Sequence, residues 1–178
     1  GTFGDVATCS FYPAHHMTMG EGGAVFSNNG ILTKAVTSIR DWGRDCWCMS
    51  GVSNTCGKRF DRQHGDLPHG YDHKYVYSHI GYNLKVLELQ GAIGLEQLKR
   101  VPNFVQARKD NFKKIYQALK PYQDKIILPT WHQKADVSWF AFPITVKDNA
   151  GFTKLDITGF LEEKKVETRK LFAGNILK

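Results

Sequence analysis

The alternation of apolar and polar positions in the first 43 residues predicts a βα arrangement. Residues 5–11 are apolar or small throughout, as in a short buried strand, and residues 22–27 form a second strand-like run followed by an Asn-Asn-Gly turn. Residues 31–43 then place apolar side chains at helical spacing and end at Gly43, a plausible C-terminal cap. The residues with this spacing are Ile31, Ala35, Val36 and Ile39.

The region from residue 44 to residue 80 has little periodicity. It contains four glycines, three clustered cysteines and four histidines. A loop of this length inside a compact protein is uncommon and is usually either functional or disordered. Its aromatic and cysteine content argues against disorder, so we expect a functional loop.

Helical and strand-like patterns return in the second half of the chain. Residues 85–101 and 101–122 predict two consecutive helices, with Pro102 near the start of the second. Residues 136–146 are strongly apolar and aromatic, as in a strand, and residues 153–166 predict a helix between two strand-like pieces. The order of elements indicates the back part of a large α/β domain, followed by the start of a smaller α+β domain.

Composition narrows the class of protein. The chain has 178 residues, 42% of them hydrophobic and 23% charged, and it lacks an apolar run near the roughly 18 residues that a membrane span needs. Its net charge of +7 is spread along helices such as 106–120 rather than gathered in a patch, which disfavours nucleic acid as a partner. We therefore expect a cytoplasmic protein without membrane insertion. The beginning at Gly1 and the abrupt end suggest an internal piece of a longer polypeptide.

The chain has four cysteines, Cys9, Cys46, Cys48 and Cys56, and the last three fall within eleven residues. A secreted disulfide scaffold would distribute its cysteines and be shorter. One residue separates Cys46 from Cys48, and seven separate Cys48 from Cys56. This spacing differs from the cysteine spacings of zinc fingers and of common ferredoxins. The clustering of the three cysteines nevertheless favours ligation of a metal or a cluster.

The stretch "CSFYPAHHMTMGEGGAVFS", residues 9–27, carries the most specific motif. On pattern alone, Ser10 could close a turn or hold a phosphate, and His15 and His16 could simply fill space. Together, however, the residues resemble the lysine segment of the sugar aminotransferases that use pyridoxal phosphate, roughly Ser-Phe-x-Pro-x-Lys-x-x-Thr-x-Gly-Glu-Gly-Gly. The matching residues are Ser10, Phe11, Pro13, Thr18, Gly20, Glu21, Gly22 and Gly23.

The chain departs from this pattern at the lysine, which is replaced by His15. An imidazole cannot form the internal Schiff base of an aminotransferase, but it can act as a general base near neutral pH. The resemblance therefore implies pyridoxamine 5'-phosphate bound without a covalent link, with His15 removing a proton from its C4′ carbon. Ser10 would bind the cofactor phosphate, and Tyr12 could assist near the substrate.

The same resemblance extends along the rest of the chain. Residues 78–98 contain a Gly-x-Asn-x-(Arg/Lys) segment, in which Asn83 would reach the cofactor phosphate of the other subunit of a homodimer. Residues 39–45 resemble the segment that follows the second strand. In residues 166–172, Arg169 would approach the nucleotide sugar. The family implies an aspartate aminotransferase-like PLP-dependent transferase of fold type I. Residues 1–100 would form the C-terminal part of the large cofactor-binding domain, with the cysteine loop at 44–80, and residues 101–178 the linking helix and an incomplete small α+β domain.

The cysteines resemble those of one branch, the iron–sulfur 3-dehydrases that act on CDP-linked 4-keto-6-deoxyhexoses in 3,6-dideoxyhexose and O-antigen biosynthesis. In that branch Cys46, Cys48, Cys56 and an upstream cysteine would hold a [2Fe–2S] cluster, and the upstream ligand would precede Gly1. We expect Cys9 to be a buried structural thiol. An NAD(P)H-dependent iron–sulfur flavin reductase would supply electrons to the cluster. The isolated 178 residues are predicted to be inactive.

Three alternatives remain open at the level of sequence. One is a cluster-free, histidine-type 3-dehydrase of the colitose pathway, and another is a plain sugar aminotransferase. The third is a non-catalytic module stabilised by zinc, with the cysteines joined by a nearby histidine. The candidates for that histidine are His64, His69 and His73.

Overall fold

A computed structural model describes residues 3–48, 51–171 and 177 of the chain. The chain divides into two compact units, Gly1–Lys99 and Arg100–Lys178. Among the residues that the structure describes, no helix combines the length and the apolar character that crossing a bilayer requires.

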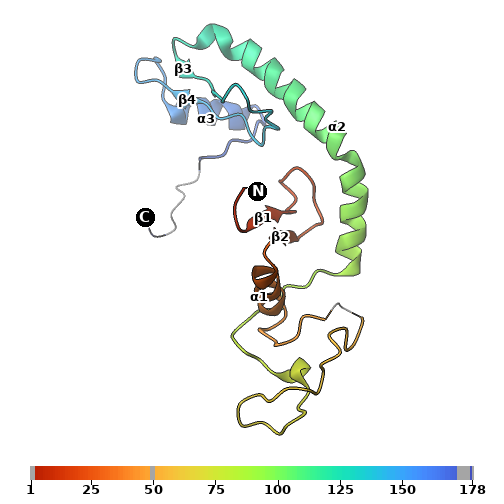
Figure 1. The fold of residues 1–178 in the computed structure, drawn as a ribbon. Coiled ribbons are helices and arrows are strands. Elements are labelled where there is room, and N and C mark those ends of the chain that lie inside the picture. The colour runs from red at the N-terminus through yellow and green to blue at the C-terminus, as the bar shows by residue number, and fades with distance from the viewer. Residues whose placement is uncertain (1–2, 49–50, 172–176, 178) are drawn as a thin grey trace. The chain divides into compact units, whose positions relative to one another are not determined.

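The first unit opens with an antiparallel pair of strands, β1 (Ala7–Ser10) and β2 (Gly23–Phe26), which lie side by side in Figure 1. The two predicted strands are therefore present. The expectation that the first is buried is wrong: among the described residues β1 pairs with β2 alone, in a two-stranded sheet, and its residues are largely exposed. Cys9 is accordingly exposed rather than a buried thiol.

Helix α1 (Gly30–Arg40) follows β2 directly. It begins because Asn29 caps it: the side-chain Oδ1 accepts hydrogen bonds from the backbone N–H groups of Ile31 at 2.9 Å and Leu32 at 3.4 Å. It ends at Arg40, and just beyond this end Gly43 adopts a φ of +78° and donates its N–H to the carbonyl of Ser38 at 2.7 Å. The predicted helix is confirmed, although it ends three residues before Gly43.

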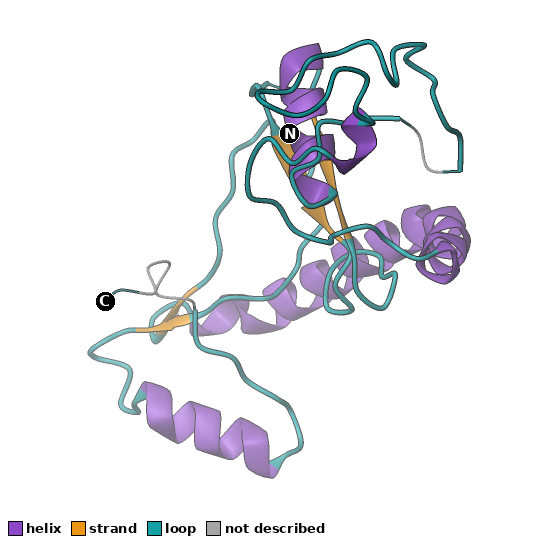
Figure 2. Ribbon diagram, turned by 90° about the horizontal axis from the view of Figure 1, so that it is seen from below, coloured by secondary structure: helices purple, strands orange, loops and turns teal. Residues whose placement is uncertain are grey.

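The segment 44–80 is irregular, as its sequence predicts. In its described part the helical structure is one short 3₁₀ turn, η1 (His73–Tyr75), which the side chain of Asp72 caps. Loop, drawn in teal in Figure 2, makes up most of the rest. Isolated bridges join Arg44 to Tyr77, and Asp41, just before the segment, to Asn83. The segment therefore leaves α1 and returns to the end of the same helix.

Helix α2 (Glu88–Leu119) is continuous, with Pro102 inside it, and the boundary between the units falls within it. The prediction of two helices divided at Pro102 is wrong. A proline removes one backbone donor from a helix, and the long helical stretches on either side of Pro102 keep their own hydrogen bonds. A 3₁₀ turn, η2 (Lys120–Tyr122), follows α2.

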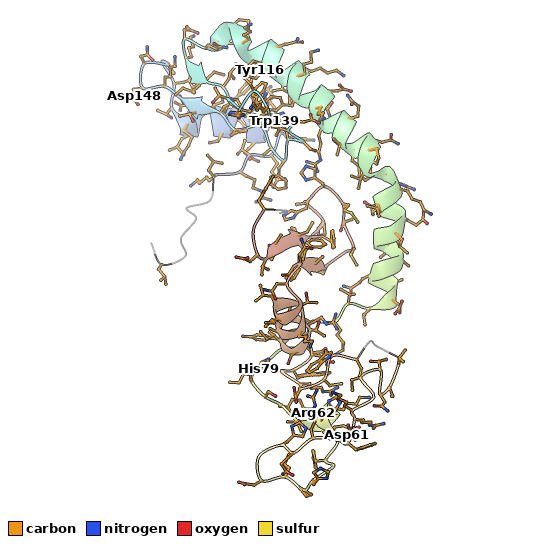
Figure 3. All side chains as sticks on the ribbon, in the orientation of Figure 1. Asp61, Arg62, His79, Tyr116, Trp139 and Asp148 are labelled. Carbon is orange, nitrogen blue, oxygen red and sulfur yellow. The ribbon has the colours of Figure 1, made fainter. Side chains whose placement is uncertain are left out.

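In the second unit, β3 (Ile126–Ile127) pairs antiparallel with β4 (Thr145–Val146). The strand predicted over 136–146 is therefore wrong except at its end. Its aromatic side chains pack against α2 instead: the ring of Trp139, which Figure 3 labels, stacks on that of Phe112, with centroids 3.7 Å apart. The aromatic residues that predicted a strand therefore pack against a helix.

Helix α3 (Lys154–Glu163) closes the second unit and confirms the helix predicted over 153–166. Thr153 and Asp156 form a reciprocal capping box at its start. The hydrogen bond from the backbone N–H of Thr153 to Asp156 lowers the pKa of that carboxyl. Residues 166–171 after the helix form no strand.

Candidate functional site

The loop that carries His15 joins β1 to β2 and is closed by backbone hydrogen bonds. The N–H of Phe11 donates to the carbonyl of Gly22 at 2.9 Å, and the N–H of Met19 donates to the carbonyl of Phe11 at 3.0 Å. Inside this ring, the N–H of His15 donates to the carbonyl of Tyr12 at 2.9 Å, forming a turn. The imidazole is therefore carried by a tight turn with a hydrogen-bonded base.

Three of the residues predicted for the cofactor site are neighbours in this loop. The rings of Tyr12 and His15 meet edge to face, with centroids 6.1 Å apart. The exposed hydroxyl of Ser10 accepts a hydrogen bond from the N–H of Tyr12 at 3.3 Å. The hydroxyl of Ser10, the phenol of Tyr12 and the imidazole of His15 therefore lie within six residues at the end of β1.

The His15 loop is anchored on the first turns of α2. Met19, which is 9% exposed, packs on Gly94, and the side-chain amide of Gln90 donates to the carbonyl of Glu21 at 2.9 Å. A Cβ atom added at Gly94 would lie 3.0 Å from Cγ of Met19, so the absence of a side chain allows this approach. We did not predict Gln90 and Gly94 as functional, and a glycine in the middle of a helical pattern was the available signal.

Substituting Gly94 by leucine in the intact protein is expected to displace Met19 and the His15 loop. Overpacking of this kind costs about 1–3 kcal/mol of unfolding free energy and should weaken binding of pyridoxamine phosphate. The matched control is Gly91→Leu on the same helix, where an added Cβ meets nothing within 4 Å. Denaturant unfolding and cofactor titration measure both effects, and equal behaviour of the two variants would contradict the anchoring role.

The segment with the Gly-x-Asn-x-Lys motif pairs with the end of α1. The N–H of Trp42 donates to the carbonyl of Tyr82 at 2.9 Å, and a Cβ at Gly81 would lie 2.2 Å from the backbone N of Gly43. Two glycines therefore permit this close approach. Asn83 lies exposed at the edge, where its Oδ1 accepts from Nζ of Lys85 at 3.2 Å.

Lys85 connects this edge to an aromatic ring. Its Nζ lies 2.8 Å from Oδ1 of Asp41 and 3.7 Å from the centroid of the Trp42 ring. The guanidinium of Arg44 also lies over Trp42, at 4.7 Å from the centroid. Trp42 has a φ of +60°, a conformation that costs free energy for a bulky residue and is often retained near functional sites.

Burial and hydrogen bonds shift the pKa values of Cys46 and Cys48 in opposite directions. The hydroxyl of Thr55 is the main cause of a lowered pKa at Cys48, to about 7, and the backbone N–H groups of Thr55 and Cys56 add to it. Burial is the main cause of a raised pKa at Cys46, with the side chain of Cys48 contributing. Cys48 is therefore the thiol of this pair that ionises more readily, as a ligand thiolate must. We did not foresee the role of Thr55.

Cys56 lies against a buried histidine. Its Sγ is 3.4 Å from Nε2 of His73, and Nδ1 of the same ring is 2.7 Å from the carbonyl oxygen of Asp45. Next to His73, the carboxylate of Asp72 accepts two hydrogen bonds from Arg59, at 2.9 Å and 2.7 Å. This interaction is the main cause of a lowered pKa at Asp72.

A cavity of about 460 Å³ lies against the cysteine loop, the irregular segment 44–80. Cys46 and Cys48 line it together with Trp42 and Lys85. The structure therefore places two of the predicted cluster ligands beside the residues that hold Asn83.

Arg169 lies in the second unit, where it is largely exposed and its Nη2 is 2.5 Å from Oε1 of Glu167. Its assignment to the nucleotide sugar stays a prediction. Figure 3 labels another arginine, Arg62, in the cysteine loop; its Nη1 lies 3.5 Å from Oδ2 of Asp45.

Known proteins are similar to this chain in sequence and in fold. Residues 1–177 match the DegT/DnrJ/EryC1/StrS aminotransferase family, so the chain belongs to that family. It is 56% identical over 178 residues to the lipopolysaccharide biosynthesis protein RfbH of Salmonella typhimurium strain LT2, and covers 41% of that protein. It is 51% identical over 176 residues to dTDP-4-dehydro-2,6-dideoxy-D-glucose 3-dehydratase of Saccharopolyspora spinosa, and covers 38% of it.

Among solved structures, the chain superimposes on the Escherichia coli GDP-4-keto-6-deoxy-D-mannose-3-dehydratase with bound hydrated PLP. The TM-score is 0.78 at 26% identity, over 99% of this chain and 43% of that one. The predicted fold of a PLP-dependent, aspartate aminotransferase-like protein is confirmed. The chain spans about two fifths of the length of these relatives.

The residues of the His15 loop fit a pyridoxamine cofactor better than an aldehyde held by a lysine. Residues 11–22 contain two histidines and no lysine. The exposed Ser10 hydroxyl at the end of a strand suits a phosphate, and an imidazole suits proton transfer.

The cysteine loop fits a cluster in its chemistry. Thiolate sulfur is the ligand that iron–sulfur clusters use, and the donors around Cys48 favour its thiolate. Within residues 3–48, 51–171 and 177, no three His, Cys, Asp or Glu side chains are grouped so that they could hold a single metal ion. In this part of the chain Cys46, Cys48 and Cys56 do not form such a group with one another, and two of them do not form one with a histidine. A two-iron cluster divides its ligands between two metals and takes a fourth sulfur in addition to these three.

Proposed function

We propose that the chain is part of an enzyme that removes the C3 hydroxyl of a nucleotide-linked 4-keto-6-deoxyhexose, and that a [2Fe–2S] cluster supplies the electrons for the reduction that follows. One observation carries the proposal: a histidine replaces the lysine of the aminotransferase loop in the same unit that holds the Cys46–Cys48–Cys56 loop. The similarity to two proteins named as 3-dehydratases supports the reaction class. We expect the enzyme to be cytoplasmic.

In this proposal His15 is the base that takes a proton from C4′ of the cofactor. When bound, pyridoxamine phosphate supplies the amine that carries the sugar and a ring that accepts the electron pair. The turn closed by Tyr12 holds the imidazole in place, and the phenol of Tyr12, which contacts the imidazole ring, would assist near the substrate. Because His15 cannot form a Schiff base, a proton-transfer role is the one that its chemistry allows.

Ser10 and Asn83 would bind the cofactor phosphate, with Asn83 acting on the site of the other subunit of a homodimer. The support for Asn83 is its place at an exposed edge of the first unit, where Lys85 holds its side-chain oxygen. Arg169 would contact the nucleotide sugar.

Loss of the C3 hydroxyl as water leaves the sugar two electrons and two protons short of the 3-deoxy product. When bound, the cluster supplies these electrons one at a time, and an NAD(P)H-dependent iron–sulfur flavin reductase would replenish it. Cys46, Cys48 and Cys56 would provide three of its ligands, and the remainder of the protein would provide the fourth. We propose a CDP-linked sugar as the substrate.

The intact protein, incubated with pyridoxamine phosphate, the reductase and NADH, tests this function. We expect CDP-4-keto-6-deoxyglucose to be converted to its 3-deoxy product with one NADH oxidised per sugar. Parallel reactions with the dTDP- and GDP-linked sugars test the choice of nucleotide. Formation of a 4-amino sugar would identify an aminotransferase, and 3-deoxy product formed without reductase or iron would identify the cluster-free dehydrase.

A further inference from the structure

We propose that His73 positions the cluster ligand Cys56 and ties together the two ends of the segment 45–56, which holds the three cysteines. This role rests on the proposed function, because it concerns a residue that acts through a ligand of the proposed cluster. In the sequence His73 was only one of three candidates for a zinc ligand, and nothing in its spacing distinguished it from His64 or His69.

The contacts of the ring carry this inference. His73 is 3% exposed, although it lies in an irregular loop. Its Nε2 faces Sγ of Cys56 at 3.4 Å, and its Nδ1 faces the carbonyl of Asp45 at 2.7 Å. Asp45 immediately precedes Cys46, so one ring contacts both ends of the segment that holds the three cysteines.

The backbone around His73 fixes the direction of the ring. Its N–H donates to the carbonyl of Arg59 at 3.4 Å, and Asp72 caps the turn η1 that carries it. The pairing of Asp72 with Arg59, at 2.7 Å, joins this turn to the residues just after Cys56. The ring is therefore held by contacts on both sides, as a residue that orients a ligand must be.

A polar contact to a ligand sulfur affects more than position. The reduction potential of an iron–sulfur cluster depends on the hydrogen bonds to its sulfurs and on its exposure to solvent. Because the carbonyl of Asp45 only accepts, Nδ1–H donates to it, and the neutral ring keeps no proton on Nε2 to donate to the sulfur. The buried ring therefore acts on this ligand by limiting its exposure to solvent. His73 is thus a positioning residue that acts on the cluster through Cys56, without contacting substrate or cofactor.

The experiment compares His73→Phe and His73→Gln with a matched control, His69→Phe, in the intact protein purified without oxygen. His69 lies in the same loop but is exposed. We measure iron and labile sulfide per chain, the EPR spectrum of the reduced state and the midpoint potential. His73→Phe is expected to lower cluster content or to shift the spectrum and the potential. Glutamine should restore part of the loss because it keeps a polar group, and His69→Phe should match the wild type.

A second measurement does not depend on the cluster. Hydrogen exchange of the cluster-free protein reports on the amides of residues 44–48 and 54–60, including the Asp45 N–H that donates to Val76 at 2.8 Å. His73→Phe should speed exchange several-fold at both ends, while the α3 amides stay unchanged and report correct folding.

If the wild-type protein holds no iron or sulfide, the proposed cluster fails, and hydrogen exchange alone decides the role of His73. If His73→Phe does not fold, the glutamine variant decides it. Wild-type exchange at both ends, together with an unchanged spectrum and potential in any variant that holds a cluster, would overturn the proposal.

Discussion

Replacement of His15 by asparagine in the intact protein is expected to slow formation of the 3-deoxy sugar by about 10²- to 10⁴-fold, the usual contribution of a positioned acid–base group. Asparagine keeps the size and polarity of the side chain but cannot accept a proton near neutral pH. The turn that holds residue 15 depends on its backbone N–H, so the loop should keep its conformation.

Exchange of the C4′ proton with solvent separates this effect from lost binding. We expect His15→Asn to abolish the exchange while pyridoxamine phosphate still binds. His16→Asn, one residue further along the same loop, is the control and should exchange at close to the wild-type rate. Wild-type exchange in His15→Asn would mean that another group is the base.

Cys48→Ser is expected to abolish reduction of the sugar and leave the proton transfer intact. Serine is a poor ligand for iron in a thiolate cluster, so the iron and labile sulfide content of the protein should fall sharply. Because His15 lies in a separate loop of the first unit, exchange at C4′ should persist.

Cys9→Ser provides the matched control for this loss. Cys9 is exposed on β1, outside the cysteine loop, and its replacement should change neither iron content nor turnover. Reduction at the wild-type rate in Cys48→Ser would contradict the assignment of this cysteine as a cluster ligand.

Local signals made part of this structure predictable from sequence. Gly43 was predicted to follow α1 as a cap, and it has a positive φ there; the Asn-Asn-Gly turn predicted before the helix contains Asn29, which the structure shows to be its N-terminal cap. The motif around His15 likewise identified a loop between two strands, which the structure contains. Caps, turns and short motifs depend on neighbours along the chain, so one sequence is enough to recognise them.

Features that depend on packing were not predictable in this way. Pro102 resembled a helix start, yet α2 continues through it. The apolar run at 136–146 resembled a strand, but Trp139 stacks on Phe112 instead. Gly94 beneath Met19 follows from contacts that no periodicity reveals.

In the cysteine loop, too, one part of the site was predictable from the sequence and another was not. The spacing of Cys46, Cys48 and Cys56 pointed to ligation. The partners that set their environment, Thr55 and His73, are brought to them by an irregular chain. Such a loop has no periodic pattern from which its contacts could be inferred.

The measurement that tests the central claim most directly is the iron and acid-labile sulfide content of the intact protein, purified without oxygen, with the EPR spectrum after dithionite reduction. We predict about two irons and two sulfides per chain and a reduced [2Fe–2S] signal that is lost in Cys48→Ser. Protein that binds pyridoxamine phosphate but contains no iron would contradict the electron-transfer dehydratase and indicate the cluster-free reaction.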